Sequence, residues 1–230
     1  MEKKAVIIPA AGTGTRMGSD IPKPFLKLFG KSILQRSIQC FLQIDGLMQV
    51  LIATSEEYFE ECKSIFDDIS HEEIQFNVVK GGNERQDSIW NAIQHLTTEI
   101  DLVAIHDAVR PFVKKVHIDN CFDAASEFGG AVLCVPAKDT IKKVNSENFI
   151  TETPDRSQLW QAQTPQVFRK KIIAEAYESA IKENFLGTDD ASLVERYGGT
   201  VKVVEGSREN LKITFPIDLK IAEFIIKEGL

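Results

Sequence analysis

Residues 9–25 read PAAGTGTRMGSDIPKPF and combine three glycines with two cations, directly after the apolar run AVII. Glycines let backbone N–H groups come close to a ligand, and N–H groups beside cations attract an anion. Arg16 offers a planar fork of donors, and Lys23 offers a point charge between the stiffening Pro22 and Pro24. A solvated surface loop would explain either cation alone, but the combination after a buried strand predicts a phosphate-binding loop.

Two common phosphate-binding loops do not fit this stretch. Gly12, Gly14 and Gly18 give the spacing G-x-G-x-x-x-G instead of G-x-G-x-x-G, and no acidic residue ends a second strand about 20 residues on. Gly30-Lys31-Ser32 resembles the end of a P-loop, but Phe25 stands where its first glycine belongs. We interpret residues 30–32 as the start of an ordinary helix and the earlier loop as one that wraps a nucleoside triphosphate.

Two further polar clusters, KGGNER at 80–85 and HDAVRP at 106–111, also follow apolar runs. Ligands of open α/β sheets bind outside the carboxyl ends of the strands, so the three clusters predict one site. Taken alone, Gly81-Gly82 also fits a plain turn, and His106 also fits a buried, hydrogen-bonded histidine. Asp107 is the sharpest signal, because a carboxylate beside a triphosphate needs a partner such as Mg²⁺ or a sugar hydroxyl.

Short apolar runs alternate along the chain with longer segments that carry apolar residues at helical spacing. This alternation predicts an α/β fold of the Rossmann-like, doubly wound class, with a mostly parallel sheet covered by helices on both faces. The predicted strands are 5–9, 49–54, 76–79, 102–106, 131–135 and 201–204. The predicted helices are 32–44, 56–68, 85–96, 116–128 and 217–226. We expect residues 1–230 to form a single domain.

The segment 136–163 breaks this rhythm, because it is polar and shows alternation at 140–144 followed by a turn at 145–148. It predicts a β-hairpin arm that projects from the sheet and returns at Trp160. A plain surface excursion also fits, but the length of the segment favours a functional or interface role.

Composition limits the partners of the protein. The 230 residues are 43% hydrophobic and carry a formal net charge of −7, which argues against a broad grip on nucleic acid or on an acidic membrane. The four cysteines (Cys40, Cys62, Cys121 and Cys134) lack C-x-x-C spacing and predict buried thiols of a reducing compartment. We expect a cytoplasmic protein with neither nucleic-acid nor membrane partners.

Together, the motifs resemble the nucleotidyltransferase signature of the sugar- and polyol-phosphate cytidylyltransferases. The resemblance spans nearly the whole chain and rests on motifs at 9–18, 22–23, 81–88, 106–111, 139–140, 155–156, 163–166, 188–192 and 210–214. It implies transfer of a cytidylyl group from CTP to a polyol phosphate, with release of pyrophosphate. The stretches 188–192 and 204–210 look more like the members that use 2-C-methyl-D-erythritol 4-phosphate than like those that use ribitol 5-phosphate, which stay the alternative.

The resemblance also implies roles for individual residues. The attacking group is then the phosphate of the second substrate, so positioning and charge stabilisation supply the rate without a protein nucleophile. The residues expected to act on the reacting phosphates are Arg16, Lys23, Arg156 and Lys212. Those expected around the nucleotide are Pro9, Ala10, Ala11, Gly12, Thr13, Gly14, Gly82, Asn83, Arg85 and Ser88. Those expected near the polyol are Asp107, Ala108, Thr140 and Thr188, and Asp107 is also the expected ligand of Mg²⁺ or another divalent cation.

The arm predicts an assembly. Taken alone, Arg156 fits a solvated charge, and Lys212 fits an outward residue of a strand. The resemblance of the surrounding motifs implies that both residues bind the attacking phosphate. The arm is too long and polar to bury itself on its own sheet, yet it carries Thr140 and Arg156. Two arms related by a two-fold axis can pack against each other's subunits. We therefore expect a homodimer in which the arm completes the neighbouring site, while Lys23 and Lys212 serve their own.

Overall fold

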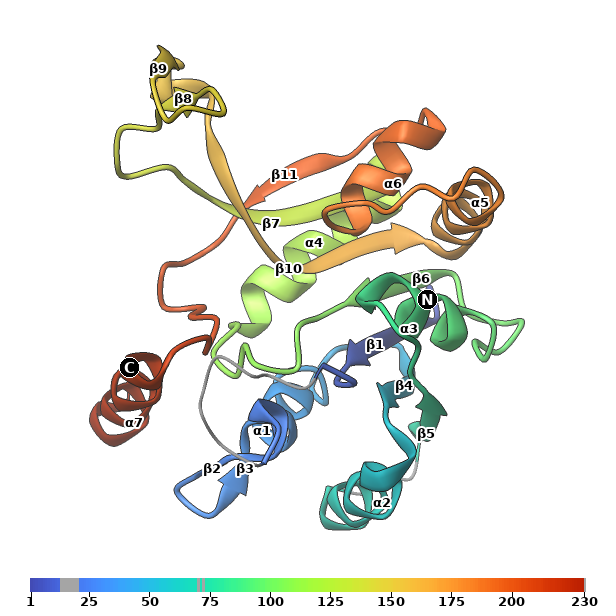
Figure 1. Ribbon diagram of the computed structural model, residues 1–230. Helices are drawn as coiled ribbons and strands as arrows, with labels where there is room; N and C mark the ends of the chain where they lie inside the picture. The colour runs from blue at the N-terminus through green and yellow to red at the C-terminus, as the bar shows by residue number, and fades with distance from the viewer. Residues whose placement is uncertain (13–20, 70, 72, 230) are drawn as a thin grey trace.

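The computed structural model describes residues 1–12, 21–69, 71 and 73–229, and its centre is a seven-stranded sheet (Figure 1). The strand order is β11-β7-β10-β6-β1-β4-β5. Neighbouring strands are parallel except where β10 pairs with β6 and β7. The strands are β1 (Lys4–Pro9), β4 (Leu47–Thr54), β5 (Gln75–Lys80), β6 (Leu102–Ile105), β7 (Gly130–Pro136), β10 (Trp160–Arg169) and β11 (Lys202–Glu205). The predicted mostly parallel α/β sheet is confirmed.

The antiparallel strand β10 is the strand that the sequence pattern concealed. Its sequence WQAQTPQVFR contains several polar residues and a proline, which argue against a central strand. In the structure, Gln166 donates to Asp189 Oδ2 at 2.8 Å and accepts from the Ala191 N–H at 2.9 Å. Gln163 donates to the Ser207 carbonyl at 3.0 Å. Hydrogen bonds to other segments therefore make polar side chains tolerable in the middle of this sheet.

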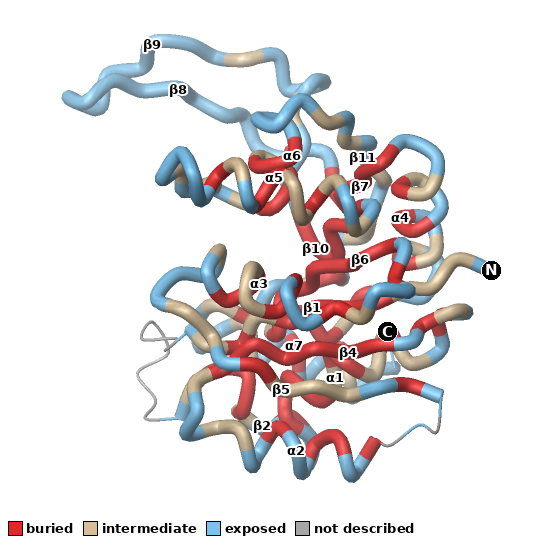
Figure 2. Tube along the Cα trace, turned by 90° about the vertical axis from the view of Figure 1, so that its right-hand side faces the viewer, coloured by how far each residue is buried: buried red, intermediate tan, exposed pale blue. Residues whose placement is uncertain are grey.

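Helices cover both faces of the sheet, and Figure 2 shows the strands as a buried layer between them. One face is covered by α1 (Ile33–Gln39), α2 (Phe59–Asp68) and α4 (Lys115–Phe128). The other is covered by α3 (Arg85–Ile93), α5 (Lys170–Lys182) and α6 (Asp190–Tyr197). All five predicted helices are present, the last as α7 (Pro216–Glu228). The helices α5 and α6 were not predicted, although the buried positions 173, 176, 177 and 180 of α5 have helical spacing.

The stretch at 30–32 begins a helix, as predicted. Gly30 lies in the turn between the short strands β2 (Lys27–Leu28) and β3 (Lys31–Ser32), with φ at +81°. Glycine adopts this left-handed conformation without steric cost. The Ser32 hydroxyl then accepts the Gln35 N–H at 3.0 Å and caps α1. This stretch is a hairpin and a helix start, not a P-loop.

The predicted hairpin arm projects far from the body of the protein (Figure 1). Its tip consists of β8 (Lys143–Val144) and β9 (Ile150–Glu152), and the Asn145 side chain fixes the turn between them by accepting two backbone N–H groups. The arm is shorter than the predicted 136–163, because residues 160–162 of β10 already pair with β7. Hydrogen bonding to the sheet therefore limits the projecting part to residues 137–159.

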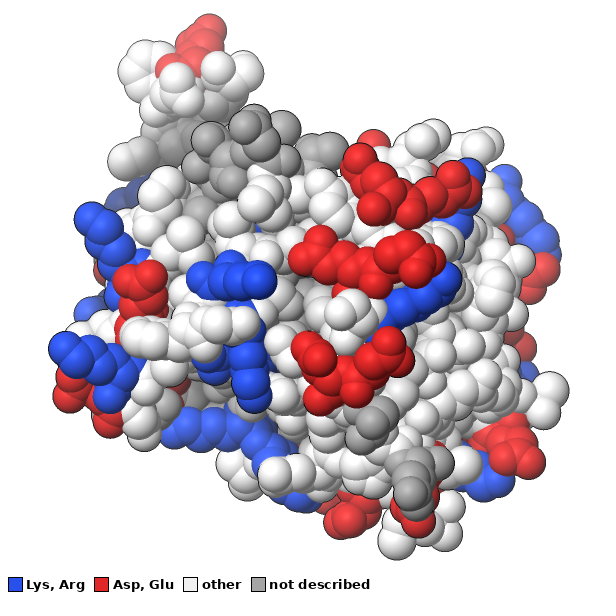
Figure 3. Space-filling model, turned by 90° about the horizontal axis from the view of Figure 1, so that it is seen from below, with Lys and Arg blue, Asp and Glu red and all other residues white. Residues whose placement is uncertain are grey.

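Helix lengths, surface charge and the burial of the cysteines can be compared with the composition. None of the described helices is long and apolar enough to cross a membrane. The face in Figure 3 carries separate acidic and basic groups and not one continuous basic area. All four cysteines are free thiols, and Cys62, Cys121 and Cys134 are buried as predicted, whereas Cys40 is half-buried. Burial raises the pKa of Cys40 and of Cys62 to about 12, so these thiols stay protonated at neutral pH.

Candidate active site

A cavity of about 300 Å³ lies at the carboxyl ends of β1 and β5. Its lining residues come from all three of the polar clusters that follow the strands, so the structure brings these clusters together at one cavity, as expected. They are Pro9, Ala10, Ala11, Gly12, Lys23, Pro24, Gly82, Asn83, Glu84, Arg85, Ser88, Asp107, Ala108, Val109 and Lys212. Three of the predicted site residues, Thr13, Gly14 and Arg16, lie outside the described residues.

Two glycines after β5 let the loops beside this cavity approach each other. A Cβ at Gly81 would lie 2.5 Å from the Ala11 Cβ, and a Cβ at Gly82 would lie 2.2 Å from the Asp87 Cβ. Ser88 Oγ accepts the Gly82 N–H at 3.0 Å and so braces the same turn. Close packing against the first loop therefore requires Gly81, and close packing of the turn against the start of α3 requires Gly82.

A second cavity, of about 360 Å³, adjoins the first and shares the charged residues Arg85, Asp107 and Lys212 with it. Its other lining residues are Arg110, Ala162, Gln163, Thr164, Gln166, Thr188 and Asp189. Thr188, which was predicted near the polyol, thus lies in the second cavity. We call the shared wall formed by Arg85, Asp107 and Lys212 the boundary. Two adjoining cavities can hold two substrates whose reacting groups meet at this boundary.

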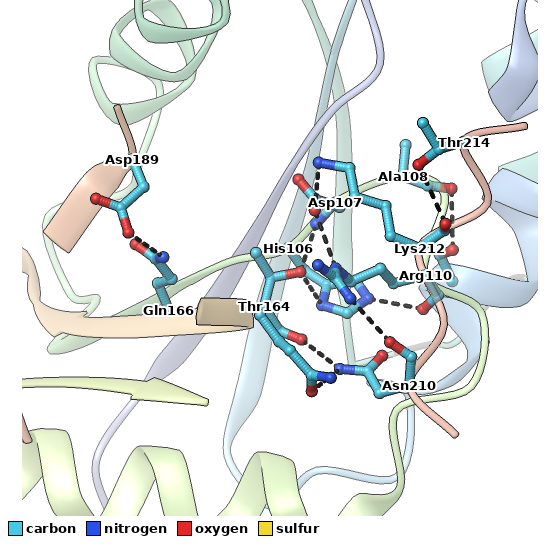
Figure 4. Close-up of polar contacts among 12 residues, drawn as sticks. His106, Asp107, Ala108, Arg110, Thr164, Gln166, Asp189, Asn210, Lys212 and Thr214 are labelled. Atoms are coloured by element: carbon cyan, nitrogen blue, oxygen red, sulfur yellow. Dashed lines mark hydrogen bonds and ion pairs between the residues drawn. The ribbon is translucent and has the colours of Figure 1, made fainter. Parts of the chain in front are cut away.

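The carboxylate of Asp107 is the electrostatic centre of the boundary (Figure 4). Its Oδ2 lies 3.0 Å from both Arg110 Nε and Lys212 Nζ, and its Oδ1 lies 3.9 Å from Arg85 Nε. Burial alone would raise the pKa of Asp107, but the charges of Lys212, Arg85 and Arg110 together outweigh burial and hold the pKa far below its usual range. Asp107 is therefore ionised at neutral pH, and protein cations provide countercharge for it.

Arg110 and Asn210 hold this arrangement in place, although the sequence assigned neither of them a role. Arg110 Nη1 donates to the Asn210 carbonyl at 2.8 Å. The Asn210 side chain donates to Gln163 Oε1 at 3.0 Å and to the Thr164 carbonyl at 2.9 Å. These bonds tie the segment before Lys212 to β10. Both residues stand in motifs that the sequence offers, but their contacts join segments up to 100 residues apart, which periodicity cannot reveal.

His106 is linked to Asp107 by a chain of hydrogen bonds through Thr164 (Figure 4). Its Nε2 lies 2.9 Å from the Arg110 carbonyl, which can only accept, so Nε2 carries the proton. Its Nδ1 then accepts from the Thr164 hydroxyl at 3.1 Å, and Thr164 Oγ1 accepts the Asp107 N–H at 3.0 Å. Burial lowers the pKa of His106 to about 4, which keeps the ring neutral. The buried, hydrogen-bonded alternative for His106 is the one that the structure shows.

This buried histidine predicts a pH dependence of stability. Below its ordinary pKa of 6.5, the unfolded chain binds a proton that folded His106 does not bind until about pH 4, so stability falls as pH falls through this window. The loss is about 1.4 kcal/mol per pH unit. We expect His106→Gln, whose amide can still donate to the Arg110 carbonyl, to flatten the profile. Urea unfolding between about pH 6.5 and pH 4.5 measures it, and equal slopes in both proteins would contradict this account of His106.

Lys23 reaches the first cavity from a short 3₁₀ helix, η2 (Lys23–Phe25). The residue is only 8% exposed, and its Nζ donates to the Thr214 carbonyl at 3.3 Å. Pro22 and Pro24 flank it, as the sequence indicated. Lys23 and Lys212 therefore line one cavity from opposite ends of the chain, and Lys212 adds its charge at the boundary.

The arm residues Thr140 and Arg156 are not brought to the two cavities of their own chain. Both are exposed, and Arg156 Nη1 donates to the Lys138 carbonyl within the arm at 2.8 Å. Among the described residues, the linings of both cavities lack Thr140 and Arg156.

A sequence model of one enzyme family covers nearly all of these features. The model for 2-C-methyl-D-erythritol 4-phosphate cytidylyltransferase matches residues 4–228. The chain belongs to this family. The matched residues thus include the sheet, both cavities and the arm, which agrees with the resemblance of the motifs.

Individual members of the cytidylyltransferase family are similar along their whole length. The 2-C-methyl-D-erythritol 4-phosphate cytidylyltransferase of Caldanaerobacter subterraneus subsp. tengcongensis is 44% identical over 99% of this chain and 100% of its own. The enzyme of the same name from Clostridioides difficile is 45% identical over 96% of this chain and 93% of its own. These names agree with the methylerythritol branch of the resemblance and not with the ribitol branch.

Solved structures of the family have the same fold. The 4-diphosphocytidyl-2C-methyl-D-erythritol synthase of Anaerococcus prevotii aligns with a TM-score of 0.88 at 26% identity, over 98% of this chain and 96% of its own. The 2-C-methyl-D-erythritol 4-phosphate cytidylyltransferase of Thermus thermophilus aligns with a TM-score of 0.79 at 30% identity, over 99% of this chain and 100% of its own.

Proposed function

We propose that this protein transfers the cytidylyl group of CTP to 2-C-methyl-D-erythritol 4-phosphate, giving 4-diphosphocytidyl-2-C-methyl-D-erythritol and pyrophosphate in the non-mevalonate isoprenoid pathway. The observation that carries the proposal is the pair of adjoining cavities with a shared cationic boundary, in a chain that belongs to this family along its whole length. CTP takes the first cavity, and the polyol phosphate takes the second.

The chemistry needs charge and geometry more than it needs a reactive side chain. A phosphate oxygen of the polyol attacks the α-phosphorus of CTP, and the bond from this phosphorus to the bridging oxygen breaks to release pyrophosphate. The attacking group is already an anion, so no base has to activate it. Two anions must nevertheless meet, which requires cations on both. In the proposal, Lys23 and Arg16 hold the triphosphate, and Lys212 at the boundary holds the attacking phosphate.

A divalent cation, Mg²⁺ or another, is part of the proposal. Mg²⁺ usually takes one or two carboxylates and fills its shell with substrate phosphates and water. Asp107 fits this role, because the group is ionised and its Oδ1 lies 3.9 Å from Arg85 Nε, beyond hydrogen-bond distance. When bound, the ion would neutralise phosphate charge.

We further propose that the protein is a homodimer whose arms complete the neighbouring sites. The projecting arm carries apolar side chains that its own chain leaves exposed, which favours a partner that covers them. The exposed apolar residues of the arm and its base are Ile141, Val144, Phe149, Ile150 and Trp160. Thr140 and Arg156 of the partner arm would then face Lys212 and Thr188 in the second cavity.

The free thiols suit a reducing compartment, so we place the protein in the cytoplasm.

Pyrophosphate release tests the proposed function. We expect release from CTP that depends on 2-C-methyl-D-erythritol 4-phosphate, and ³¹P NMR should show the diphosphate diester as product. Chelation of divalent cations should stop turnover, and Mg²⁺ should restore it. ATP or UTP turning over as well as CTP would contradict the assignment of the first cavity to cytidine.

A further inference from the structure

Asp190 is a charged residue that the proposed chemistry does not use, although it is completely buried at the first position of α6. Its Oδ1 accepts hydrogen bonds from Arg85 Nη1 at 3.1 Å and from the Tyr177 hydroxyl at 2.5 Å. Its Oδ2 accepts from Arg85 Nη2 at 2.8 Å. Burial, and then the charge of Asp190, raise the pKa of Tyr177, so the hydroxyl stays protonated and donates. The carboxylate is thus committed to Arg85 and Tyr177.

Arg85 connects this buried carboxylate to the boundary. It is the first residue of α3, its side chain is 37% exposed, and it lines both cavities. With Nη1 and Nη2 held by Asp190, its Nε lies 3.9 Å from Asp107 Oδ1. Arg85 therefore stands between two carboxylates, one buried beneath the site and one at its centre.

The surrounding elements make this connection rigid. Gln86 of α3 donates to the Phe185 carbonyl and accepts the Gly187 N–H, both at 3.0 Å, so α3 is fastened to the segment before α6. Trp90 of α3 stacks on Tyr177 of α5, with ring centroids 6.3 Å apart and planes 8° from parallel. Within this framework, Arg85 is the boundary side chain that Asp190 binds directly.

We propose that Asp190 is a positioning residue for the transfer reaction. By binding both terminal nitrogens of Arg85, it keeps the Arg85 cation at the boundary and holds its Nε 3.9 Å from Asp107 Oδ1, short of direct hydrogen-bond contact. The inference rests on the proposed function, because that function places the reacting phosphates at the boundary.

The charges at the boundary explain the effect. In the ion pairs of the described residues, the three cations Arg85, Arg110 and Lys212 share the two carboxylates of Asp107 and Asp190 where two phosphates must meet. Asparagine at position 190 would keep the shape but remove the charge that holds Arg85. The guanidinium could then move from 3.9 Å into direct hydrogen-bond contact with Asp107 and compete with Lys212, so the cation for the attacking phosphate would be displaced. A displacement of about 1 Å at a reacting group costs up to about 10²-fold in rate.

A double-mutant cycle tests the proposal, with kcat and KM measured for CTP and for 2-C-methyl-D-erythritol 4-phosphate. We expect Asp190→Asn to lower kcat/KM for the polyol phosphate by about 10- to 100-fold. Arg85→Met should lower it at least as much, and the double variant should match Arg85→Met, because Asp190 acts through Arg85. Tyr177→Phe, which removes one bond to Asp190 and keeps both charges, should cost about 3- to 10-fold and replaces Asp190→Asn in the cycle if that variant does not fold.

Ser192→Ala is the matched control. The Ser192 hydroxyl bonds to the Asp189 backbone in the capping box that starts α6 and does not bind Arg85, so its loss should leave kcat/KM close to the wild-type value. Effects of Asp190→Asn and Arg85→Met that multiply in the double variant would overturn the proposal. An equal loss in Ser192→Ala would overturn it too, since the start of α6 would then be the cause. A wild-type protein that does not turn over these substrates would instead contradict the proposed function.

Discussion

Lys23→Ala should lower kcat by roughly 10²- to 10³-fold while the protein stays folded. Lys23 is held by a short 3₁₀ helix between two prolines, and its buried position directs the ammonium into the first cavity. The charge on the α-phosphate and on the leaving pyrophosphate grows as the transition state forms. A fixed cation therefore gains interaction energy at that stage, which appears in kcat.

Lys27→Ala provides the control for this prediction. Lys27 lies four positions further along, is exposed, and does not line either cavity among the described residues. Its loss should leave both constants near wild type. If Lys23→Ala raised KM for CTP and left kcat unchanged, Lys23 would bind the ground state and the transition state equally, and its proposed role would be wrong.

A mixture of two inactive variants, Arg156→Ala and Lys23→Ala, should regain activity. In each mixed dimer, one site would combine the intact Lys23 of one subunit with the intact Arg156 of the other. Random exchange makes half of the dimers mixed, so activity should return to about a quarter of the wild-type level. The structure motivates this expectation, because Arg156 is exposed on the arm and bonds to the arm's own Lys138 carbonyl.

Subunit exchange must be verified for this experiment, for example by mass spectrometry of differently tagged chains. Lys212→Ala, mixed with Lys23→Ala in the same way, controls for nonspecific effects of mixing, because both lysines line the cavity of their own chain and the mixture should stay inactive. A mixture of Arg156→Ala and Lys23→Ala that exchanges subunits and stays inactive would show that the arm serves its own chain.

The carboxyl ends of the strands were predictable because buried parallel strands have a strong local signature. A run of β-branched and aliphatic residues followed by a polar cluster marks both the strand and its end, as at 5–12 and 102–111. The three clusters then had to meet at one edge of the sheet. The first cavity, including Lys23 and Asp107, follows from that rule.

The second cavity was less predictable, because long-range polar contacts build it. The polar side chains of β10 contradict the pattern of a central strand until their partners on other segments are known. The pairing of Arg85 with Asp190 joins residues 105 positions apart and has no local signature. The need of Asp107 for positive charge was predictable, whereas its contacts with Arg110 and Lys212 required the fold.

The choice of polyol phosphate tests the central claim most directly. Pyrophosphate release with CTP should be measured against 2-C-methyl-D-erythritol 4-phosphate and ribitol 5-phosphate, as kcat/KM for each in the same preparation. We expect a ratio of at least about 10² in favour of the methylerythritol substrate, since polar groups that recognise one substrate's hydroxyls are left unpaired by another. Equal constants, or a preference for ribitol 5-phosphate, would contradict the assignment of the second cavity and with it the proposed function.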